Sequence, residues 1–271
     1  MTSVFVDALG KPHPLAGADA RIVSLVPSIT ELLFALDLGA QVVGRTGFCV
    51  HPRDAVQAIP KVGGTKDVKV DALRALRPTH VIVNIDENEA PTVETIRAFT
   101  PHVVVTHPNA PAENLALYRL LGGIFDRSRQ AEALCAGLQR ELDACAAVDW
   151  KNESVLYLIW KEPWMTIAAD TYIAATLARV GWKVPHGAGG WRGAARYPVI
   201  EDIDAAIAGV DRVLLSSEPF IFRQPQVAEM RALYPRQRVD FIDGEMTSWY
   251  GNRAIEGLRY LRRLRGATQN P

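Results

Sequence analysis

Cysteine is scarce in this sequence, and it has neither a long apolar run nor an excess of charge of either sign. Cys135 and Cys145 stand ten residues apart in one expected helix, about 15 Å along its axis, which is too far for a disulfide; Cys49 is the third cysteine. No window reaches the roughly 20 apolar residues of a membrane span. Acidic and basic residues number 30 each, so net charge offers no attraction to nucleic acid.

The amino-terminal residues lack the basic start and apolar stretch of a secretory signal peptide. An odd number of cysteines without a workable pair is typical of a reducing compartment. We therefore expect a cytoplasmic protein. The alternative is a periplasmic protein, if the chain is the mature fragment of a longer precursor.

Sequence motifs of catalysis and cofactor binding are also missing. VGGTKD at 62–67 is glycine-rich but lacks the spacing of a phosphate-binding loop, and no GxGxxG, GxSxG, HExxH or CxxC is present. Cys49 and His51 would need two further ligands to hold a metal ion, and His107 and His186 have no evident partners. We therefore predict a protein without catalytic or metal-ligating residues. An enzyme that assembles its site from scattered side chains stays open.

One long helix, expected at residues 126–147, organises the chain. Its apolar residues recur at spacings of three and four, and no proline interrupts it. On each side, short apolar runs typical of buried parallel strands alternate with helical patterns; examples are 21–26 and 80–84 before it, and 154–160 and 212–217 after it. We predict an α/β fold of two Rossmann-like lobes with parallel sheets, joined by this backbone helix, with a ligand cleft between the lobes. The expected division is 1–125, 126–147 and 148–271.

Aromatic residues concentrate in the second half, where 15 of the 21 lie, including all six tryptophans. Several follow expected strands, at the ends where open parallel sheets bind ligands, and large flat rings suit a large flat ligand. Trp182 and Tyr157 lie inside regular elements and are interpreted as core. The candidate ligand-binding aromatics of this half are Trp160, Trp164, Trp191, Tyr197, Phe220, Trp249 and Tyr250.

Three stretches together resemble a known family. They are RIVSLVPSITELLFALDLGAQVVGRTGFCVHP at 21–52, KVGGTKDVKVDALRALRPTHVIVN at 61–84 and YPVIEDIDAAIAGVDRVLL at 197–215. The chain resembles the helical-backbone (class III) solute-binding proteins, the periplasmic receptors of ABC importers for cobalamin, ferric siderophores and haem. It is most similar to the cobalamin-binding members, and among those to a branch without signal peptides. The resemblance implies transport rather than catalysis.

Position by position, the resemblance implies further site residues. Phe48 matches an aromatic residue of the family's cleft, Tyr197 a cleft tryptophan, and Trp164 falls near a cleft phenylalanine. Trp249 and Tyr250 fall near an aromatic pair of the last loop. Two positions that are aromatic in the family carry polar residues here, Lys66 and Asn84. We add Arg253 to the ligand-binding set because it adjoins the last pair in a block that is both polar and aromatic.

The resemblance also implies a ligand and a partner. The ligand is cobalamin or another metal chelate, namely haem or a ferric siderophore, and no cofactor is required. Asp71 and Glu201 match or lie near the acidic residues that the family presents to permease arginines, although acids at helix starts are also favoured by the helix dipole. We expect a monomer that binds no nucleic acid. The alternative function is a cytoplasmic enzyme acting on a corrinoid or small acid, with Glu87, Glu162 or Glu245 as acid or base.

Overall fold

The structure, a computed structural model, describes residues 4–185 and 195–269. Its contacts divide the chain into two compact units. Unit 1 comprises Met1–Pro108, Glu113–Leu138 and Tyr250–Asn252, and unit 2 comprises Asn109–Ala112, Gln139–Trp249 and Arg253–Pro271. One boundary between the units therefore falls inside the long helix. The short segments Asn109–Ala112 and Tyr250–Asn252 each belong to a different unit from the residues on either side of them.

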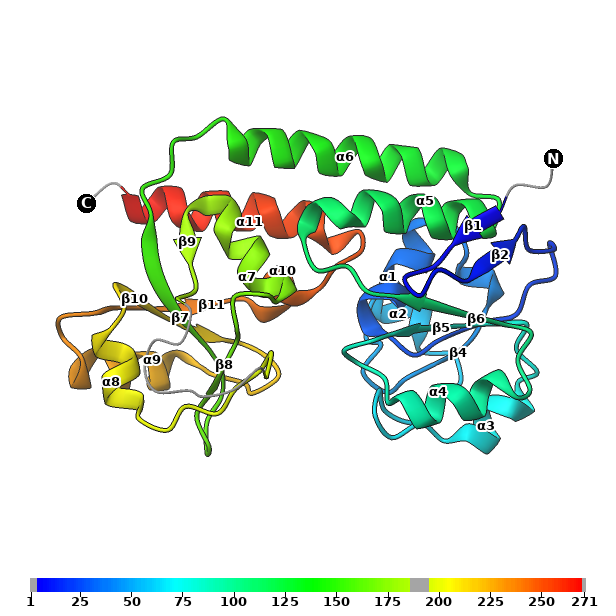
Figure 1. The fold of residues 1–271 in the computed structure, drawn as a ribbon, viewed down its shortest axis with the longest axis horizontal. Helices are drawn as coiled ribbons and strands as arrows, with labels where there is room; N and C mark the ends of the chain where they lie inside the picture. The colour runs from blue at the N-terminus through cyan, green and yellow to red at the C-terminus, as the bar shows by residue number, and fades with distance from the viewer. Residues whose placement is uncertain (1–3, 186–194, 270–271) are drawn as a thin grey trace. The chain divides into compact units, whose positions relative to one another are not determined.

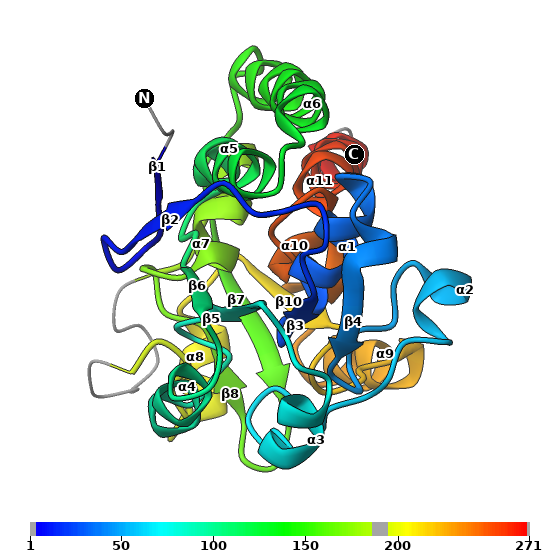
Figure 2. The same cartoon turned by 90° about the vertical axis from the view of Figure 1, so that its right-hand side faces the viewer.

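Unit 1 contains a four-stranded parallel sheet in the order β4-β3-β5-β6. Figures 1 and 2 show α5 on one side of β5 and β6, with α3 and α4 on the other. The elements of this unit are β1 (Val4–Val6), β2 (Pro12–Pro14), β3 (Ile22–Ser24), α1 (Pro27–Ala35), β4 (Val42–Arg45), α2 (Arg53–Val56), α3 (Val70–Ala75), β5 (His80–Asn84), α4 (Ala90–Arg97), β6 (His102–Thr106) and α5 (Asn114–Ile124), with a short 3-10 turn at Gly39–Gln41. A second 3-10 turn, Pro111–Glu113, spans the boundary between the two units.

Alternation along the strands of unit 1 decides which face each residue covers. Val81 and Val83 of β5 pack with Leu73 of α3 and Ile96 of α4 in one buried cluster. Ile82, which lies between those valines, is also fully buried. Because side chains alternate across a strand, β5 is buried on both faces, as expected for a strand inside a parallel α/β sheet.

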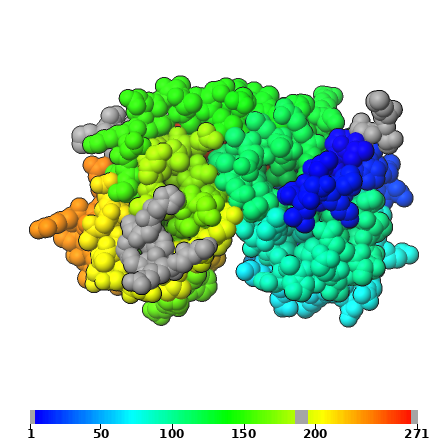
Figure 3. Space-filling view, viewed as in Figure 1, coloured from blue at the N-terminus to red at the C-terminus, as the bar shows by residue number. Residues whose placement is uncertain are grey.

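A hairpin of β1 and β2 lies on the surface of unit 1 (Figure 3) and is attached to the sheet through Asp7. The Asp7 carboxylate accepts hydrogen bonds from the backbone N–H groups of Leu9, Lys11 and Val105, at 2.9 to 3.1 Å, and lies 3.0 Å from His13 Nε2. Burial alone would raise the pKa of Asp7, but the hydrogen bonds from His13 and the backbone outweigh it and leave that pKa lowered.

Histidines gather where this hairpin meets the amino ends of β5 and β6. The rings of His80 and His102 stack with centroids 4.7 Å apart, and His13 lies 6.3 Å from His102. Nε2 of His80 is buried without a hydrogen-bond partner among the described residues. Burial, with the neighbouring His102 and His13, lowers the pKa of His80 to about 4.

Helix α6 (Ser128–Ala146) begins in unit 1 and ends in unit 2. The sequence predicted this helix at 126–147, and the structure begins it two residues later because Asp126 adopts a positive φ of 54°, which is not helical. In unit 2, Glu141 of α6 accepts hydrogen bonds from Arg259 and Arg262 of α11 (Arg253–Gln269), at 2.7 to 3.1 Å. These contacts join the end of α6 to α11, which runs beside it in Figure 1.

Unit 2 contains a second sheet in the order β11-β10-β7-β8, with β9 also paired to β7. The pairs of β7, β10 and β11 are parallel, and β8 is antiparallel to β7. The elements are β7 (Glu153–Trp160), β8 (Met165–Thr166), α7 (Tyr172–Leu177), β9 (Trp182–Lys183), α8 (Ile203–Ala208), β10 (Arg212–Ser216), α9 (Gln224–Leu233), β11 (Arg238–Ile242), α10 (Gly244–Ser248) and α11 (Arg253–Gln269), with a 3-10 turn at Ala178–Val180.

Two separate cores flank the sheet of unit 2. Val155, Tyr157 and Ile159 of β7 pack with residues of α7 and α11, whereas Leu156 and Leu158 pack with residues of α8 and α9. Trp182 and Tyr157 are fully buried in the first core, as the sequence predicted. The predicted α/β fold with parallel sheets is confirmed, whereas the predicted three-part division of the chain stays a prediction.

Candidate functional site

Aromatic rings cluster at the carboxyl ends of β7 and β10 in unit 2. Trp160, the last residue of β7, is 39% exposed and meets Phe220 edge to face, with centroids 5.7 Å apart. Trp164 stacks almost parallel on Phe222, at 6.1 Å, and Phe222 is buried in the core. Phe220 and Phe222 are 4.7 Å apart and so connect the two pairs. We call Trp160, Trp164, Phe220 and Phe222 the aromatic rim. Offset and edge-to-face contacts of this kind hold rings in fixed orientations.

The segment that contains Tyr197 lies beside β8 and the residues after it, and backbone hydrogen bonds join the two. The backbone N–H of Thr166 donates to Pro198 O at 3.1 Å, and that of Ala168 to Arg196 O at 2.8 Å. Arg196 also donates through Nη2 to the side-chain oxygen of Asn109, at 2.7 Å. Tyr197 is 38% exposed. Its backbone is thus fixed on both sides while a large part of its side chain stays accessible to a ligand.

Trp249, which directly follows α10, contacts the polar side chains of Glu218 and Arg253. Oε1 of Glu218 accepts hydrogen bonds from Ser248 Oγ at 2.6 Å and from Trp249 Nε1 at 3.0 Å. The guanidinium of Arg253 lies over the Trp249 ring, 4.9 Å from its centroid, and pairs with Glu245 at 3.1 Å. The indole is therefore held by a hydrogen bond at its edge and a cation on its face.

The pKa of Glu218 is raised. Burial is the largest cause, and the nearby carboxylates of Glu245 and Asp243 add to it, although the hydrogen bonds from Ser248 and Trp249 act in the opposite direction. The sequence predicted Glu87, Glu162 or Glu245 as acid or base in the enzyme alternative, and it did not assign that role to Glu218. No local pattern marks Glu218, because its burial comes from residues 26 to 31 positions later in the chain.

Three buried hydroxyl groups, of Tyr157, Ser216 and Thr247, are hydrogen-bonded to one another beneath Glu218, whose backbone N–H donates to Ser216 Oγ at 3.3 Å. Tyr157 Oη donates to Ser216 Oγ at 2.9 Å and lies 2.6 Å from Thr247 Oγ1. Burial raises the pKa of Tyr157, so the phenol stays protonated and able to donate. Gly244 makes the close approach possible, since a Cβ there would lie 2.4 Å from Cγ of Glu218 and 2.6 Å from Ser216 Oγ. The glycine lets α10 start directly against Glu218.

Unit 1 carries a smaller apolar surface at the carboxyl ends of its strands. Phe48, in the loop after β4, is 64% exposed, and its ring passes over Gly64, where a Cβ would lie 3.3 Å from Cε2. Ile85, directly after β5, is 44% exposed. Lys66 extends into solvent and lies 3.8 Å from Glu89. Phe48 is thus the accessible aromatic that the sequence predicted in this half.

Asn84 is buried, unlike Phe48, Ile85 and Lys66 of the same unit. It is 3% exposed; its Oδ1 accepts from the backbone N–H of Asp86 at 2.8 Å and its Nδ2 points to Thr106 Oγ1 at 3.4 Å. Its own backbone N–H donates to Asn88 Oδ1 at 2.9 Å. Asn84 therefore shapes the loop after β5, and its predicted contact with a ligand stays a prediction.

Tyr250 belongs to unit 1, although its neighbour Trp249 belongs to unit 2. It is 7% exposed and its hydroxyl donates to Glu87 Oε1 at 2.5 Å. The resemblance placed Tyr250 and Trp249 near an aromatic pair of the family's last loop, and the ligand contact of both stays a prediction. The structure places them in separate surroundings, because the chain passes from one unit to the other between them.

The remaining predicted site residues are peripheral or outside the described residues. The Asp71 side chain, in α3, is 99% exposed and lies 3.9 Å from Arg74. Glu201 is exposed, directly before Asp202, whose side chain accepts from the N–H of Ala205 and caps α8. Trp191 lies outside the described residues. The two acids are accessible to a partner, and that role stays a prediction.

Within residues 4–185 and 195–269, no group of three or more histidine, cysteine, aspartate or glutamate side chains could hold a metal ion. His107 Nε2 does lie near Asp86 Oδ2, at 3.5 Å. Among the helices of the same residues, none is both long and apolar enough to cross a membrane.

Residues 22–206 match the model of the family described as "Periplasmic binding protein". This stretch contains the sheet of unit 1, α6, and β7 with the aromatic residues that follow it. The chain belongs to this family. The resemblance that the sequence showed to solute-binding proteins is thereby confirmed.

Two curated relatives are vitamin B12-binding proteins. The one from Vibrio parahaemolyticus is 23% identical over 56% of this chain and 56% of its own length, and the one from Pectobacterium atrosepticum is 21% identical over 49% and 48%. The chain thus spans about half the length of these relatives. The substrate-binding lipoprotein YvrC of Bacillus subtilis, an uncharacterised ABC transporter protein, is 36% identical over 29% of this chain and 24% of its own.

Solved structures match over nearly the whole chain and show the same fold. The periplasmic vitamin B12-binding protein BtuF of Vibrio cholerae superposes with a TM-score of 0.76 at 15% identity, covering 93% of this chain and 98% of its own. The periplasmic haem-binding protein RhuT of Roseiflexus sp. RS-1 gives 0.73 at 20% identity, covering 92% and 98%. Their ligands differ, so fold alone does not select the ligand.

The predicted cytoplasmic location is wrong. It rested on the missing signal pattern and on the unpaired cysteines. The family is one of periplasmic binding proteins, BtuF of Vibrio cholerae and RhuT are periplasmic, and YvrC is a lipoprotein, which points outside the cytoplasm. The cysteine argument failed because Cys49, Cys135 and Cys145 are all buried as free thiols, and a small buried thiol packs as an apolar residue in any compartment.

Proposed function

We propose that this protein binds a corrinoid, or a related metal chelate, as the non-enzymatic solute-binding component of an ABC importer outside the cytoplasm. The observation that carries the proposal is the aromatic rim at the carboxyl ends of β7 and β10, with Trp249 directly after α10 and the accessible Tyr197 beside β8. Parallel sheets bind ligands at this end, and flat rings cover a flat macrocycle with much apolar area and little loss of side-chain entropy. Phe48 and Lys66 of unit 1 are the proposed contributions of the other half.

Polar groups beside the rings support a ligand that carries amide side chains around its macrocycle. Arg253 and Glu218 both contact Trp249, and they present a fixed donor and a carboxyl group next to an apolar ring. Such a mixture of apolar area and a few oriented polar groups is typical of small-molecule sites.

The test is an absorbance titration of the purified protein with cyanocobalamin, cobinamide and haemin, followed by calorimetry of every ligand that shifts the spectrum. We expect one-to-one binding of a corrinoid. Binding of haemin alone would contradict the corrinoid assignment and keep the chelate class. No binding of these three or of a ferric siderophore would contradict the proposed function.

The double variant Trp164→Leu/Tyr197→Leu tests where the ligand binds. Each stacked ring contributes on the order of 1 kcal/mol beyond its buried area, so we expect affinity to fall by about tenfold or more. The matched control is Trp150→Leu/Tyr234→Leu, which removes the same two residue types near the amino ends of the unit 2 strands. An equal loss of affinity in both double variants would contradict a ligand site at the carboxyl ends.

The proposed partner is an ABC permease that contacts Asp71 in unit 1 and Glu201 in unit 2. Both side chains are exposed, as charges that meet arginines of a membrane partner must be. We expect Asp71→Asn/Glu201→Gln to bind the chelate normally and to fail in stimulating ATP hydrolysis by the reconstituted importer. Normal stimulation by that variant would contradict the docking role.

A further inference from the structure

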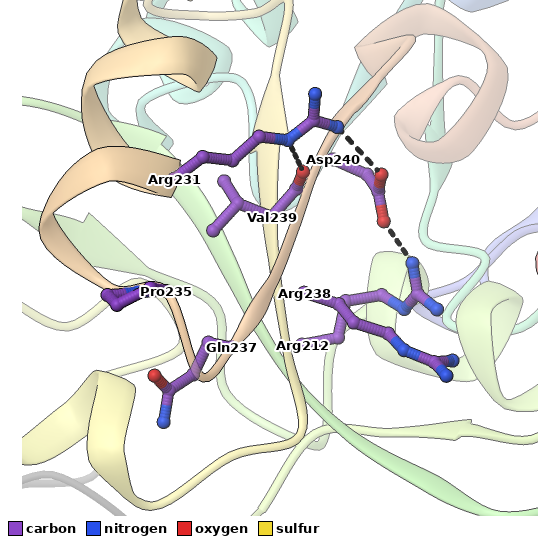
Figure 4. A pocket seen from close by; sticks show the side chains of 7 residues that line it. All are labelled: Arg212, Arg231, Pro235, Gln237, Arg238, Val239 and Asp240. Atoms are coloured by element: carbon purple, nitrogen blue, oxygen red, sulfur yellow. Dashed lines mark hydrogen bonds and ion pairs between the residues drawn. The ribbon is translucent and has the colours of Figure 1, made fainter.

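A pocket lies in unit 2 at the amino ends of β10 and β11, opposite to the end where the aromatic rim lies. Its volume is about 380 Å³, within the range of small-molecule sites. The last residues before β11 and the side of α9 complete its walls (Figure 4). The residues that line it are Arg212, Arg231, Pro235, Gln237, Arg238, Val239 and Asp240.

Arg212 forms a rigid floor for this pocket. Its side chain is 2% exposed, and it donates from Nε and Nη2 to Glu153, at 3.1 and 3.3 Å, and from Nη1 to Asp240. A guanidinium engaged on three of its nitrogens cannot rotate away. The floor of the pocket therefore carries a fixed positive charge.

Two further arginines stand at the mouth. Arg231 of α9 donates from Nε to Val239 O at 2.8 Å and from Nη2 to Asp240 Oδ1 at 3.2 Å, and its side chain is 57% exposed. Arg238 is 61% exposed and reaches Glu153 Oε1 only at 3.4 Å. Figure 4 shows Asp240 held between Arg231 and Arg212, with Arg238 beside Arg212. Each outer arginine keeps donors directed to solvent.

The charges of this region do not balance. The pocket walls contain three guanidinium groups against the single carboxylate of Asp240, a surplus of two positive charges. The next layer does not remove the surplus, because the carboxylates of Glu153 and Asp211 are balanced by Arg265, 3.0 Å from Glu153, and by Lys151 near Asp211. Burial is the largest cause that lowers the pKa of Arg265, and the neighbouring Arg212 and Arg238 lower it further, against the pairing with Glu153.

We propose that this pocket is a binding site for a phosphate group, as inorganic phosphate or as a small phosphate monoester. A phosphate monoester carries about −1.5 to −2 charges near pH 7, which matches the surplus. Its oxygens accept the paired N–H groups of a guanidinium fork, and Arg231 and Arg238 provide such forks from two different elements. Because the pocket and the aromatic rim lie at opposite ends of the same strands, phosphate and the chelate bind without competing.

The test is a titration of the full chain with inorganic phosphate and with glycerol phosphate, at constant ionic strength maintained with chloride. The readouts are calorimetry and the thermal unfolding midpoint, which rises with ligand that binds the folded state alone. We expect saturable one-to-one binding of both probes and no comparable effect of succinate, a dicarboxylate. No saturable binding of phosphate, or equal binding of succinate, would overturn the proposal.

Variants locate the site. We expect Arg231→Gln/Arg238→Gln to weaken phosphate binding by about tenfold or more, because each substitution removes charge-assisted hydrogen bonds. The matched control is Arg236→Gln/Arg263→Gln, which removes the same two charges from exposed arginines that do not line the pocket. Both outer arginines are surface residues, so the folded state should persist. An equal loss in the control would show attraction by net charge alone and would overturn the proposal.

Discussion

The hydroxyl of Tyr250 donates a 2.5 Å hydrogen bond to the carboxylate of Glu87, a residue 163 positions earlier in the chain. It is one of several contacts that hold the short segment Tyr250–Asn252 in unit 1. Gly251 N–H donates to Asn114 Oδ1 at 2.6 Å, and Gly251 O accepts from Tyr118 Oη at 2.7 Å. Burial, together with the charge of Glu87, raises the pKa of Tyr250 well above its usual value, so the phenol remains a donor.

Removing that hydroxyl should destabilise the protein. We expect Tyr250→Phe to lower the free energy of unfolding by about 1.5 to 3 kcal/mol, the range for a hydrogen bond to a charged group. Tyr118→Phe, which loses a bond to the neutral carbonyl of Gly251, should cost about 1 kcal/mol. Chemical denaturation of both variants measures the difference. A smaller loss for Tyr250→Phe than for Tyr118→Phe would contradict this account of the segment.

Gly251 permits the same segment to pack closely. Its φ is +80°, and a Cβ there would lie 3.2 Å from Ser28 O and 3.3 Å from Cβ of Leu32. We expect Gly251→Ala to cost about 1 to 3 kcal/mol of unfolding free energy, from backbone strain and contact together. Gly10→Ala is the matched control, since Gly10 has φ of +76° and nothing within 4 Å of its Cβ position. Equal losses in the two variants would assign the whole effect to backbone strain.

Glu218 should make stability depend on pH in a direction opposite to that of most carboxyl groups. Its pKa is raised in the folded state, so between the ordinary value of 4.5 and the raised value the folded protein binds more protons than the unfolded chain. The stabilisation that this proton provides is complete below pH 4.5 and is lost as pH rises through the folded pKa.

The variant Glu218→Gln isolates this effect, because glutamine keeps an acceptor for Ser248 and Trp249 but cannot ionise. We expect its stability relative to the unmodified protein to be higher at pH 8 than at pH 4, measured by denaturation at both values. Glu229→Gln, at an exposed position of α9, should show no such trend. A stability difference between the two proteins that stays constant with pH, or falls as pH rises, would show that the pKa of Glu218 is not raised by folding.

His80 should destabilise the protein in acid. Its pKa falls from 6.5 to about 4 on folding, so between these values the unfolded chain binds more protons, and stability is lost as pH falls through this window. The shift corresponds to about 3 kcal/mol between pH 7 and pH 4. We expect His80→Phe, which keeps a ring against Phe125, to reduce this loss, and His51→Gln, in the loop after β4, to leave it unchanged. Parallel curves for His80→Phe and the unmodified protein would contradict the assignment.

Part of the candidate site was predictable because its signals are local. The ends of β7 and β10 follow from continuous apolar runs, and the rings of Trp160, Trp164 and Phe220 follow directly after them. Their mutual packing was not predictable: Trp164 stacks on Phe222, a residue 58 positions later that the sequence did not assign to the site. Pairings over such separations depend on the order of the strands in the sheet, which local periodicity does not specify.

The sequence by itself determined the α/β class, the long helix α6 and the membership of the solute-binding family. Each of these depends on short-range patterns, namely apolar runs, helical spacing and continuous motif stretches. Tertiary structure alone decided that Tyr250 is buried against Glu87 while Trp249 is held by Glu218 and Arg253. It alone also decided that three arginines, from β10, α9 and β11, line one pocket together with the carboxylate of Asp240. The physical reason is that burial and electrostatic environment come from neighbours distant in sequence, so identical residue types acquire different roles only once the chain is folded.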